Sequence, residues 1–309
     1  MEPLGDDVCI ASVQRLTIAN MRRIGNALVC SLLLSSAGAC GGRSSPATVA
    51  IPPPDPSKVA VSLSSGGLYC PNEYLSWSLT WRGLRGATTQ MVVGEPGVLS
   101  GQDAIVIRSS SKSSPLATMF REVREELTSE ISLESGQPVS NTGDAWEDKK
   151  RELTEIQYDA DAKGFDTKLS TNFMGGQSWH YNLDSKVSDL HSFLAVFRKW
   201  QAEPGTRGQA YVQNGRSVFQ VELAMVGPES VTSDATGKTA AIRLQGMSKR
   251  IFMDGKKVLD GNEFDFSIWR SDDSRFLPLR FEVETRLGTI RGELVDYRHA
   301  PDMKCIVIP

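Results

Sequence analysis

The sequence predicts a mainly β protein, in which a large curved antiparallel sheet closes towards a barrel or sandwich and packs against one principal α-helix. Three observations predict this fold. Apolar and polar residues alternate through most of the chain after residue 73, and a period of two is the pattern of a β-strand. Turn pairs such as Asn214-Gly215 and Asp254-Gly255 separate the alternating segments. A single segment, 187–201, has apolar residues at the spacing of an amphipathic helix.

Composition excludes several classes of protein. The chain has 309 residues, of which 40% are hydrophobic and 23% charged, as in ordinary globular proteins. Its formal net charge of −3 does not suggest the basic face of a nucleic-acid-binding protein, so we expect no nucleic-acid partner. The five cysteines include no CxxC pair and no Cys/His cluster, which argues against a zinc site. We therefore expect no metal and no cofactor.

Residues 21–39 have the layout of an export signal. Two arginines form the positive start, a short apolar core follows, and small residues lead to Cys40. The run Ala37-Gly38-Ala39-Cys40 resembles a bacterial lipobox, although Ala37 stands where leucine is usual. This pattern predicts a lipoprotein, with lipid attached to the Cys40 thiol and the chain cleaved before it. The alternative is cleavage at an ordinary signal-peptidase site, which would give a soluble secreted protein.

The segments on either side of this signal have other expected roles. Residues 1–20 are acidic where an export signal would be basic, so we expect translation to start at Met21; a genuinely long n-region is the alternative. Residues 40–65 are rich in proline, serine and glycine and predict an extended tether. Residues 66–309 are expected to form a single β-rich domain. Gly41, in place of an aspartate, favours an outer-membrane anchor with the domain facing the periplasm.

The first part of the domain is predicted to be a hairpin. A strand begins at Glu73, the chain turns at 82–86, and a second strand returns over 87–93. The first strand has four apolar residues on one face, Leu75, Trp77, Leu79 and Trp81. Two tryptophans on one strand face usually belong to a core, and the alternative is an aromatic wall that lines a ligand. A short apolar strand is predicted at 104–107.

The middle of the chain gives weaker patterns. Residues 115–120 are expected to form a short helical turn. Residues 125–134 have helix-forming composition, but their apolar residues alternate with polar ones, so we predict a strand. The charged interval 141–150 is expected to be a loop or the end of a long hairpin. Two further strands, 153–159 and 164–170, are expected to pair.

The predicted helix, 187–201, takes Ser188 as its N-cap and ends before Pro204-Gly205. Its apolar stripe consists of Leu190, Phe193, Leu194 and Phe197. His191 lies one residue from this stripe and is expected to be a packed or surface residue. The chain then returns to strands, predicted at 208–212, 217–226, 239–245, 250–253 and 257–259, and closes with a three-stranded meander over 263–297.

Four stretches resemble the bacterial DUF3108 family of unknown function. They are YLSWSLTWRGLRGATTQM, FREVREELTSEIS, the helical segment 190–198 and the closing FSIWRSDDSRFLPLRFEVETRLGTIRGELVDY. The resemblance covers about residues 70–299 and implies an exported protein or lipoprotein of a bacterium with two membranes. It carries over no catalytic or ligand-binding residues. The chain departs from the family pattern in its two flanking cysteines and in the charged interval 141–150.

The sequence has no sign of an enzyme. It lacks GxSxG, HExxH and a glycine-rich phosphate loop, although a hydrolase could still assemble from distant residues. Two hypotheses remain. The first is a binding or carrier module for an apolar ligand, lined by Trp77, Trp81, Phe193 and Phe197. The second is a structural or assembly lipoprotein that contacts envelope proteins. An open apolar cavity would favour the first, and a filled core with an exposed apolar patch would favour the second.

Cys70 and Cys305 are predicted to form a disulfide. Cleavage would remove Cys9 and Cys30, and lipid would occupy Cys40, which leaves one pair in an oxidising compartment. The two cysteines flank the first and last predicted strands, which neighbour each other in many barrels and sandwiches. The alternative is two free, unrelated cysteines.

Overall fold

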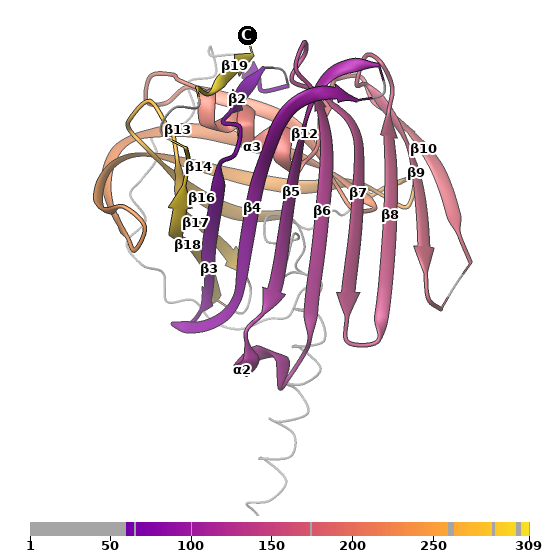
Figure 1. Cartoon of the computed structure of the whole chain (residues 1–309), viewed down its shortest axis with the longest axis horizontal. Helices are drawn as coiled ribbons and strands as arrows, with labels where there is room; N and C mark the ends of the chain where they lie inside the picture. The colour runs from indigo at the N-terminus through magenta and orange to yellow at the C-terminus, as the bar shows by residue number, and fades with distance from the viewer. Residues whose placement is uncertain are drawn as a thin grey trace, which may run out of the picture.

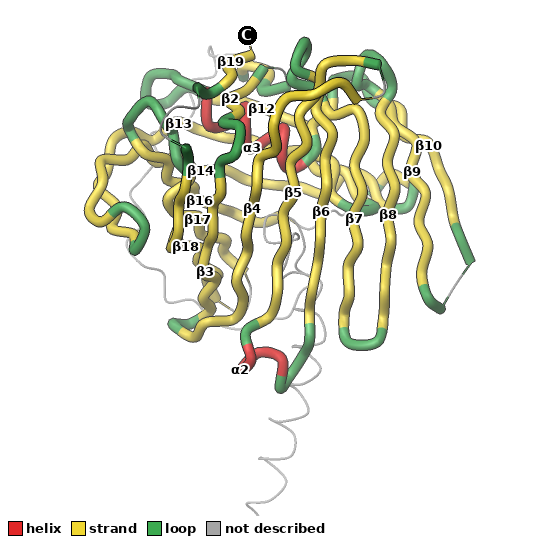
Figure 2. Tube along the Cα trace, viewed as in Figure 1, coloured by secondary structure: helices red, strands yellow, loops and turns green. Residues whose placement is uncertain are grey.

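The computed structural model describes residues 60–64, 66–99, 101–173, 175–258, 263–285, 288–300 and 304–308. The predictions for 1–20, for the signal at 21–39 and for Cys40 therefore lie outside the described residues. The described chain is mainly β, as the sequence predicted, with two helices (Figures 1 and 2). The helices are α2 (Pro115–Thr118) and α3 (Leu190–Lys199).

The strands run through the whole described chain. They are β1 (Val61–Ser62), β2 (Gly67–Tyr69), β3 (Tyr74–Trp81), β4 (Leu84–Leu99), β5 (Gln102–Ser113), β6 (Val123–Ser132), β7 (Pro138–Glu147), β8 (Lys150–Tyr158), β9 (Gly164–Thr171), β10 (Gln177–Asn182), β11 (Val187–Ser188), β12 (Arg207–Asn214), β13 (Ser217–Ser233), β14 (Gly237–Met253), β15 (Lys256–Lys257), β16 (Glu263–Ser271), β17 (Pro278–Thr285), β18 (Gly288–Arg298) and β19 (Ile306–Ile308).

All but two of these strands belong to one sheet of 17 strands. Strands β3 to β10 form a continuous antiparallel meander, and β18 pairs with β3 to join it to the strands that follow α3. In Figure 1 the meander forms the near wall, and β12, β13 and β14 cross behind it. The remaining strands, β2 and β19, form a small sheet of their own.

The core lies between these two walls, and α3 is inserted there. Phe193 and Phe197 of α3 pack in a cluster with apolar side chains of the far wall. The histidine of the same helix, His191, bonds to serines of β5 and β6 in the near wall. Tyr181 of β10, at the end of the meander, donates a hydrogen bond to the carbonyl of Arg216, between β12 and β13, at 2.9 Å. This side-chain contact joins the end of the near wall to the far wall.

Helix α3 differs from its prediction in where it begins. Ser188 was expected to be the N-cap, but Val187 and Ser188 pair with β12 as the short strand β11. The N-cap is Asp189, whose carboxylate accepts a hydrogen bond from the Ser192 backbone N–H at 2.8 Å. The Ser192 hydroxyl accepts one in return from the Asp189 backbone N–H, which completes a capping box. Because Ser188 is paired in β11 and Asp189 makes both cap hydrogen bonds, the prediction of Ser188 was wrong.

Other predictions differ from the structure in detail. The interval 141–150, expected to be a loop or the end of a long hairpin, is the end of a long hairpin, because it forms the end of β7 and the start of β8. The two strands expected at 239–245 and 250–253 are one long strand, β14. Strand β10 was not predicted at all. The folded part also begins before residue 66, since Leu63 is buried.

No helix among the described residues is both long and apolar enough to cross a membrane.

Candidate functional site

Helix α2 is fixed beneath one end of the sheet by a single serine. The Ser114 hydroxyl accepts a hydrogen bond from the Ala117 backbone N–H at 3.2 Å and donates one to the Arg85 carbonyl at 2.8 Å. Pro115 follows as the first helical residue, where the missing N–H costs nothing. The N-cap thus also ties α2 to strand β4. This places the helix beside the start of β4 and the end of β5.

A pocket of about 130 Å³ lies between α2 and these strand ends. Its exposed wall is almost entirely apolar. The larger apolar side chains that form it are Leu79, Trp81, Leu84, Leu116, Phe120 and Ile290, and Arg85 and Arg121 also line it. For scale, an apolar cavity of about 150 Å³ can hold a benzene molecule. The pocket is therefore large enough for one small apolar group.

The pocket continues the inward face of strand β3. Leu75, Trp77 and Leu79 are buried on that face, and Trp81 is half-buried at its end. The Trp77 indole N–H donates to the Pro278 carbonyl at 2.8 Å, so this ring is held in the core. Core side chains fill the face as far as Leu79. Only its last part, around Trp81, opens to the pocket.

The four residues predicted to line an apolar ligand site are not brought together. Trp81 lines the pocket, but Trp77 lies in the core cluster behind it. Phe193 and Phe197 are buried in a different cluster, under α3. A periodic pattern could not indicate Leu84, Leu116 and Phe120, because Leu84 begins β4 directly after a turn and the other two lie in or just after the four-residue helix α2. The available signal was the apolar residues within the expected turn 82–86 and the expected helical turn 115–120.

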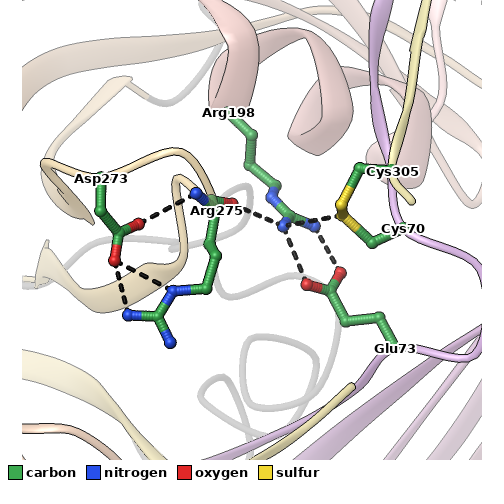
Figure 3. The surroundings of a disulfide bond; sticks show 6 residues. All are labelled: Cys70, Glu73, Arg198, Asp273, Arg275 and Cys305. Atoms are coloured by element: carbon green, nitrogen blue, oxygen red, sulfur yellow. Dashed lines mark hydrogen bonds and ion pairs between the residues drawn. A yellow bond between two sulfur atoms is a disulfide. The ribbon is translucent and has the colours of Figure 1, made fainter. Parts of the chain in front are cut away.

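Cys70 and Cys305 are joined in a disulfide, and their Cα atoms are 4.1 Å apart (Figure 3). The bond lies where the short strands β2 and β19 pair, next to the first long strand. Among the described residues, the one group of metal-binding side chains close enough to share an ion is Cys70, Cys305 and His299. Its two sulfur atoms are bonded to each other, and a metal takes the free thiolate.

A buried ion pair lies beside the disulfide (Figure 3). The guanidinium of Arg198, at the end of α3, donates to both carboxylate oxygens of Glu73, at 2.5 and 2.9 Å. It also donates to the Arg275 carbonyl at 2.8 Å. Arg198 is 2% exposed and Glu73 is fully buried, so bulk water solvates neither charge. The pair joins α3 to the start of β3 and is a structural link.

A second polar cluster surrounds His191. Its Nδ1 lies 2.6 Å from the Ser129 hydroxyl, and its Nε2 lies 2.9 Å from the Ser109 hydroxyl. The Ser129 oxygen also accepts a hydrogen bond from the Asn141 amide, at 3.0 Å. Burial lowers the pKa of His191, while the nearby Asp189 carboxylate raises it by less. The ring is therefore held in its neutral form.

The arrangement resembles a serine–histidine pair, but both side chains lie inside the protein: Ser129 is fully buried and His191 is 3% exposed. Neither residue lines the pocket beneath α2. The hydrogen bonds of this cluster join α3 to β5 and β6.

Comparison with known proteins identifies a family. The model of the DUF3108 family, described as a protein family of unknown function, matches residues 76–295. No curated protein matches the chain.

Three solved structures are distantly similar. A β-barrel-like protein of the domain of unknown function DUF1849, from Brucella abortus, has a TM-score of 0.47 and 11% identity, over 78% of this chain and 100% of that one. A candidate exported protein with a YmcC-like fold, from Bacteroides fragilis, has a TM-score of 0.31 and 8% identity, over 76% and 99%. A candidate lipoprotein from Parabacteroides distasonis has a TM-score of 0.33 and 7% identity, over 78% and 100%. Likenesses this distant support no inference about the present chain.

Proposed function

The chain belongs to the DUF3108 family, and we propose that it is a cell-envelope lipoprotein whose β domain is a non-catalytic binding module for an apolar ligand. The observation that carries the proposal is the apolar pocket beneath α2. Leu84, Leu116 and Phe120 at its edge are 58%, 50% and 65% exposed, although a soluble domain gains by burying such side chains. A ligand that covers them would remove apolar surface from water on both sides.

The size of the pocket limits what can enter it. About 130 Å³ is comparable to the cavity that holds one benzene ring, so a whole lipid does not fit. The end of an acyl chain or one large apolar side chain does. The wall offers almost no polar group to fix a head group, so binding is expected to select for apolar character and size. We therefore propose an acyl chain end as the ligand group.

The anchor of the proposed lipoprotein rests on the sequence. Cys40 with its preceding small residues would carry the lipid, and the proline-rich segment that follows would hold the domain away from the membrane. Gly41 supports an outer-membrane location on the periplasmic side. The membrane is then a partner through the lipid, independently of what the pocket binds.

One observation favours the second hypothesis, a structural or assembly lipoprotein that contacts other envelope proteins. Met119 is 78% exposed next to Phe120, and Met119 does not line the pocket. A protein partner could cover both side chains and insert one of its own into the pocket. This alternative predicts a stable complex with an envelope protein, whereas the first predicts a bound small apolar molecule.

Binding of a fluorescent fatty acid to the purified mature chain tests the proposal. Ala117 lines the pocket from α2, so Ala117→Trp would fill the pocket and is expected to weaken binding at least about tenfold. Val98→Ser is the matched control, because Val98 is 71% exposed and lies elsewhere. Native mass spectrometry after lipid extraction identifies what the envelope-purified protein carries. Equal binding by wild type and Ala117→Trp would refute the pocket as the ligand site.

A further inference from the structure

The two rims of the near wall differ in their exposed side chains. Because β3 to β10 are antiparallel, every second turn lies at the same rim (Figure 1). We define the lower rim as segments 80–86, 112–124, 146–151 and 170–177, which include α2 and the pocket mouth. The upper rim comprises the intervening turns, segments 97–104, 132–138, 158–164 and 182–190.

The large exposed apolar side chains gather at the lower rim. Among the described residues, every exposed Leu, Met, Phe or Trp lies there, and the other exposed large apolar residues are valines. The six are Leu84, Leu116, Met119, Phe120, Trp146 and Phe173. They come from all four segments of the lower rim, which are far apart in sequence, so local composition does not explain the clustering. Such a concentration marks an interaction surface.

The two rims also differ in charge. The lower-rim segments contain eight Lys and Arg and three Asp and Glu, whereas the upper-rim segments contain two and six. The chain as a whole has a net charge of −3, so the lower rim opposes the overall sign. Some lower-rim cations pair with carboxylates, as in Arg121 with Glu147. Arg85, Lys112 and Lys149 are exposed and belong to none of the ion pairs found in the described chain.

Aromatic rings and arginines occur together at this rim. The Arg82 guanidinium lies over the Trp81 ring at 5.1 Å, and that of Arg151 lies over the Trp146 ring at the same distance. An amphipathic ring beside a cation suits the boundary between water and hydrocarbon, where the ring enters the apolar side and the charge stays in water. Exposed apolar residues alone would fit many partners. Their combination with cations fits a surface whose outer layer is anionic and whose interior is apolar.

We propose that the lower rim docks on the surface of a lipid bilayer with anionic headgroups. Arg85, Lys112 and Lys149 meet the phosphates, while Met119, Phe120, Trp146 and Phe173 enter the boundary between headgroups and acyl chains. The acidic upper rim points away from the same surface. This contact does not depend on the pocket binding anything. If the proposed function also holds, docking brings the pocket mouth to the acyl chains, and the ligand comes from the membrane itself.

Vesicle flotation of the mature chain carrying Cys40→Ala tests the docking, because that variant has no lipid of its own. We expect it to float with vesicles of phosphatidylethanolamine and phosphatidylglycerol at about 0.1 M salt. It should be released at about 1 M salt, where the Debye length falls to about 3 Å. Vesicles of phosphatidylcholine alone should bind at least about tenfold less. No binding to the anionic vesicles, or equal binding to both kinds, would overturn the proposal.

Variants at the two rims locate the contact. Lys112→Glu with Lys149→Glu should lower binding to anionic vesicles at least about tenfold, and so should Met119→Ser with Phe173→Ser. The matched controls are Lys163→Glu and Val98→Ser on the upper rim. Both should leave binding to anionic vesicles unchanged. All six positions are exposed, so near-ultraviolet circular dichroism should show an intact fold. Upper-rim changes that weaken binding as much as lower-rim changes would refute the assignment.

The pocket variant separates this proposal from the proposed function. Ala117→Trp should keep its vesicle binding while it loses the fluorescent fatty acid. Lys112→Glu with Lys149→Glu should do the opposite, because neither residue lines the pocket. Failure of fatty-acid binding with intact vesicle binding would refute the proposed function alone. Failure of vesicle binding with intact fatty-acid binding would refute the docking alone.

Discussion

At the scale of single residues, His191 should make stability depend on pH. Burial lowers its pKa in the folded state below the ordinary value of 6.5. Between the two values the unfolded chain takes up a proton that the folded chain does not, so acid favours unfolding. We expect the contribution of His191 to the free energy of unfolding to be constant above pH 6.5. Below that pH it should fall as the pH decreases towards the pKa of His191 in the folded state. The slope from this one proton is at most about 1.4 kcal/mol per pH unit.

Urea denaturation of His191→Gln across the same pH range measures this effect. The variant should lose the acid-side slope, because glutamine does not titrate. Ser129→Ala is the matched control: it removes a hydrogen bond to the ring but keeps the buried histidine, so the slope should persist. A slope that is unchanged in His191→Gln would show that other groups cause it.

The buried pair of Glu73 and Arg198 gives a second prediction at this scale. Glu73→Gln leaves the Arg198 guanidinium without a countercharge at a site that is 2% exposed. Breaking a buried pair from one side costs about 3–5 kcal/mol. The double variant Glu73→Leu with Arg198→Met removes both charges and should cost clearly less than Glu73→Leu and Arg198→Met added together. Chemical denaturation of wild type, these two single variants and the double variant forms the double-mutant cycle.

An exposed ion pair is the control for that cycle. Lys249 and Glu263 lie 2.7 Å apart, with side chains 40% and 48% exposed. Glu263→Gln should change the free energy of unfolding by less than about 1 kcal/mol, because water already solvates both charges. If Glu73→Gln costs no more than Glu263→Gln, the buried pair does not stabilise the fold as described.

At the scale of elements, the small sheet of β2 and β19 depends on the disulfide. Three residue pairs join these strands, and Cys70 and Cys305 lie directly beside them. The bond closes a loop with a sequence separation of 235, for which the chain-entropy model gives roughly 5 kcal/mol as an upper figure. Cys70→Ser with Cys305→Ser should lower stability by up to that amount. Amide exchange should increase first in β2 and β19.

Thiol counting tests the bond itself. The mature protein, denatured without reductant, should show no alkylatable thiol, and two should appear after reduction. A peptide that contains both Cys70 and Cys305 should be found by mass spectrometry before reduction. Two reactive thiols in the unreduced protein would contradict the disulfide.

The elements also show what sequence patterns can and cannot predict. Strand β6 was predicted correctly despite its glutamates, because one of its faces is buried and the alternation follows that face. Strand β7 was missed because neither of its faces is well buried, so its side chains have no period of two. Its place in the sheet comes from backbone pairing with β6 and β8, which side-chain patterns do not report.

The pocket could not have been predicted in the same way. Its wall combines Trp81, Leu116 and Ile290, which come from β3, α2 and β18. Ile290 meets Trp81 because β18 pairs with β3 across more than 200 residues of sequence, as the register of the two strands shows. Local patterns predicted each strand but not this pairing. Trp81 could be identified as a candidate lining residue because it lies on the apolar face of one predicted strand.

At the scale of the whole molecule, two independent contacts with the membrane are expected. The proposed lipid on Cys40 would be the first: each buried CH₂ contributes about 0.8 kcal/mol, so two or more acyl chains would make release negligibly slow. The lower rim is the second, and because it depends on cations, salt weakens it. The two contacts can therefore be separated by ionic strength. This matters because either one alone would keep the protein in a membrane pellet at low salt.

Cell fractionation of wild type and Cys40→Ala tests this expectation. Wild type should remain in the membrane pellet at both about 0.1 M and about 1 M salt, because burial of acyl chains does not depend on salt. Cys40→Ala should stay partly with the membrane at the lower salt and be released at the higher one. Globomycin, which inhibits the lipoprotein signal peptidase, should make the wild-type precursor accumulate. Cys40→Ala that still partitions into detergent at high salt would contradict lipidation at this cysteine, and complete release at low salt would contradict the docking of the lower rim.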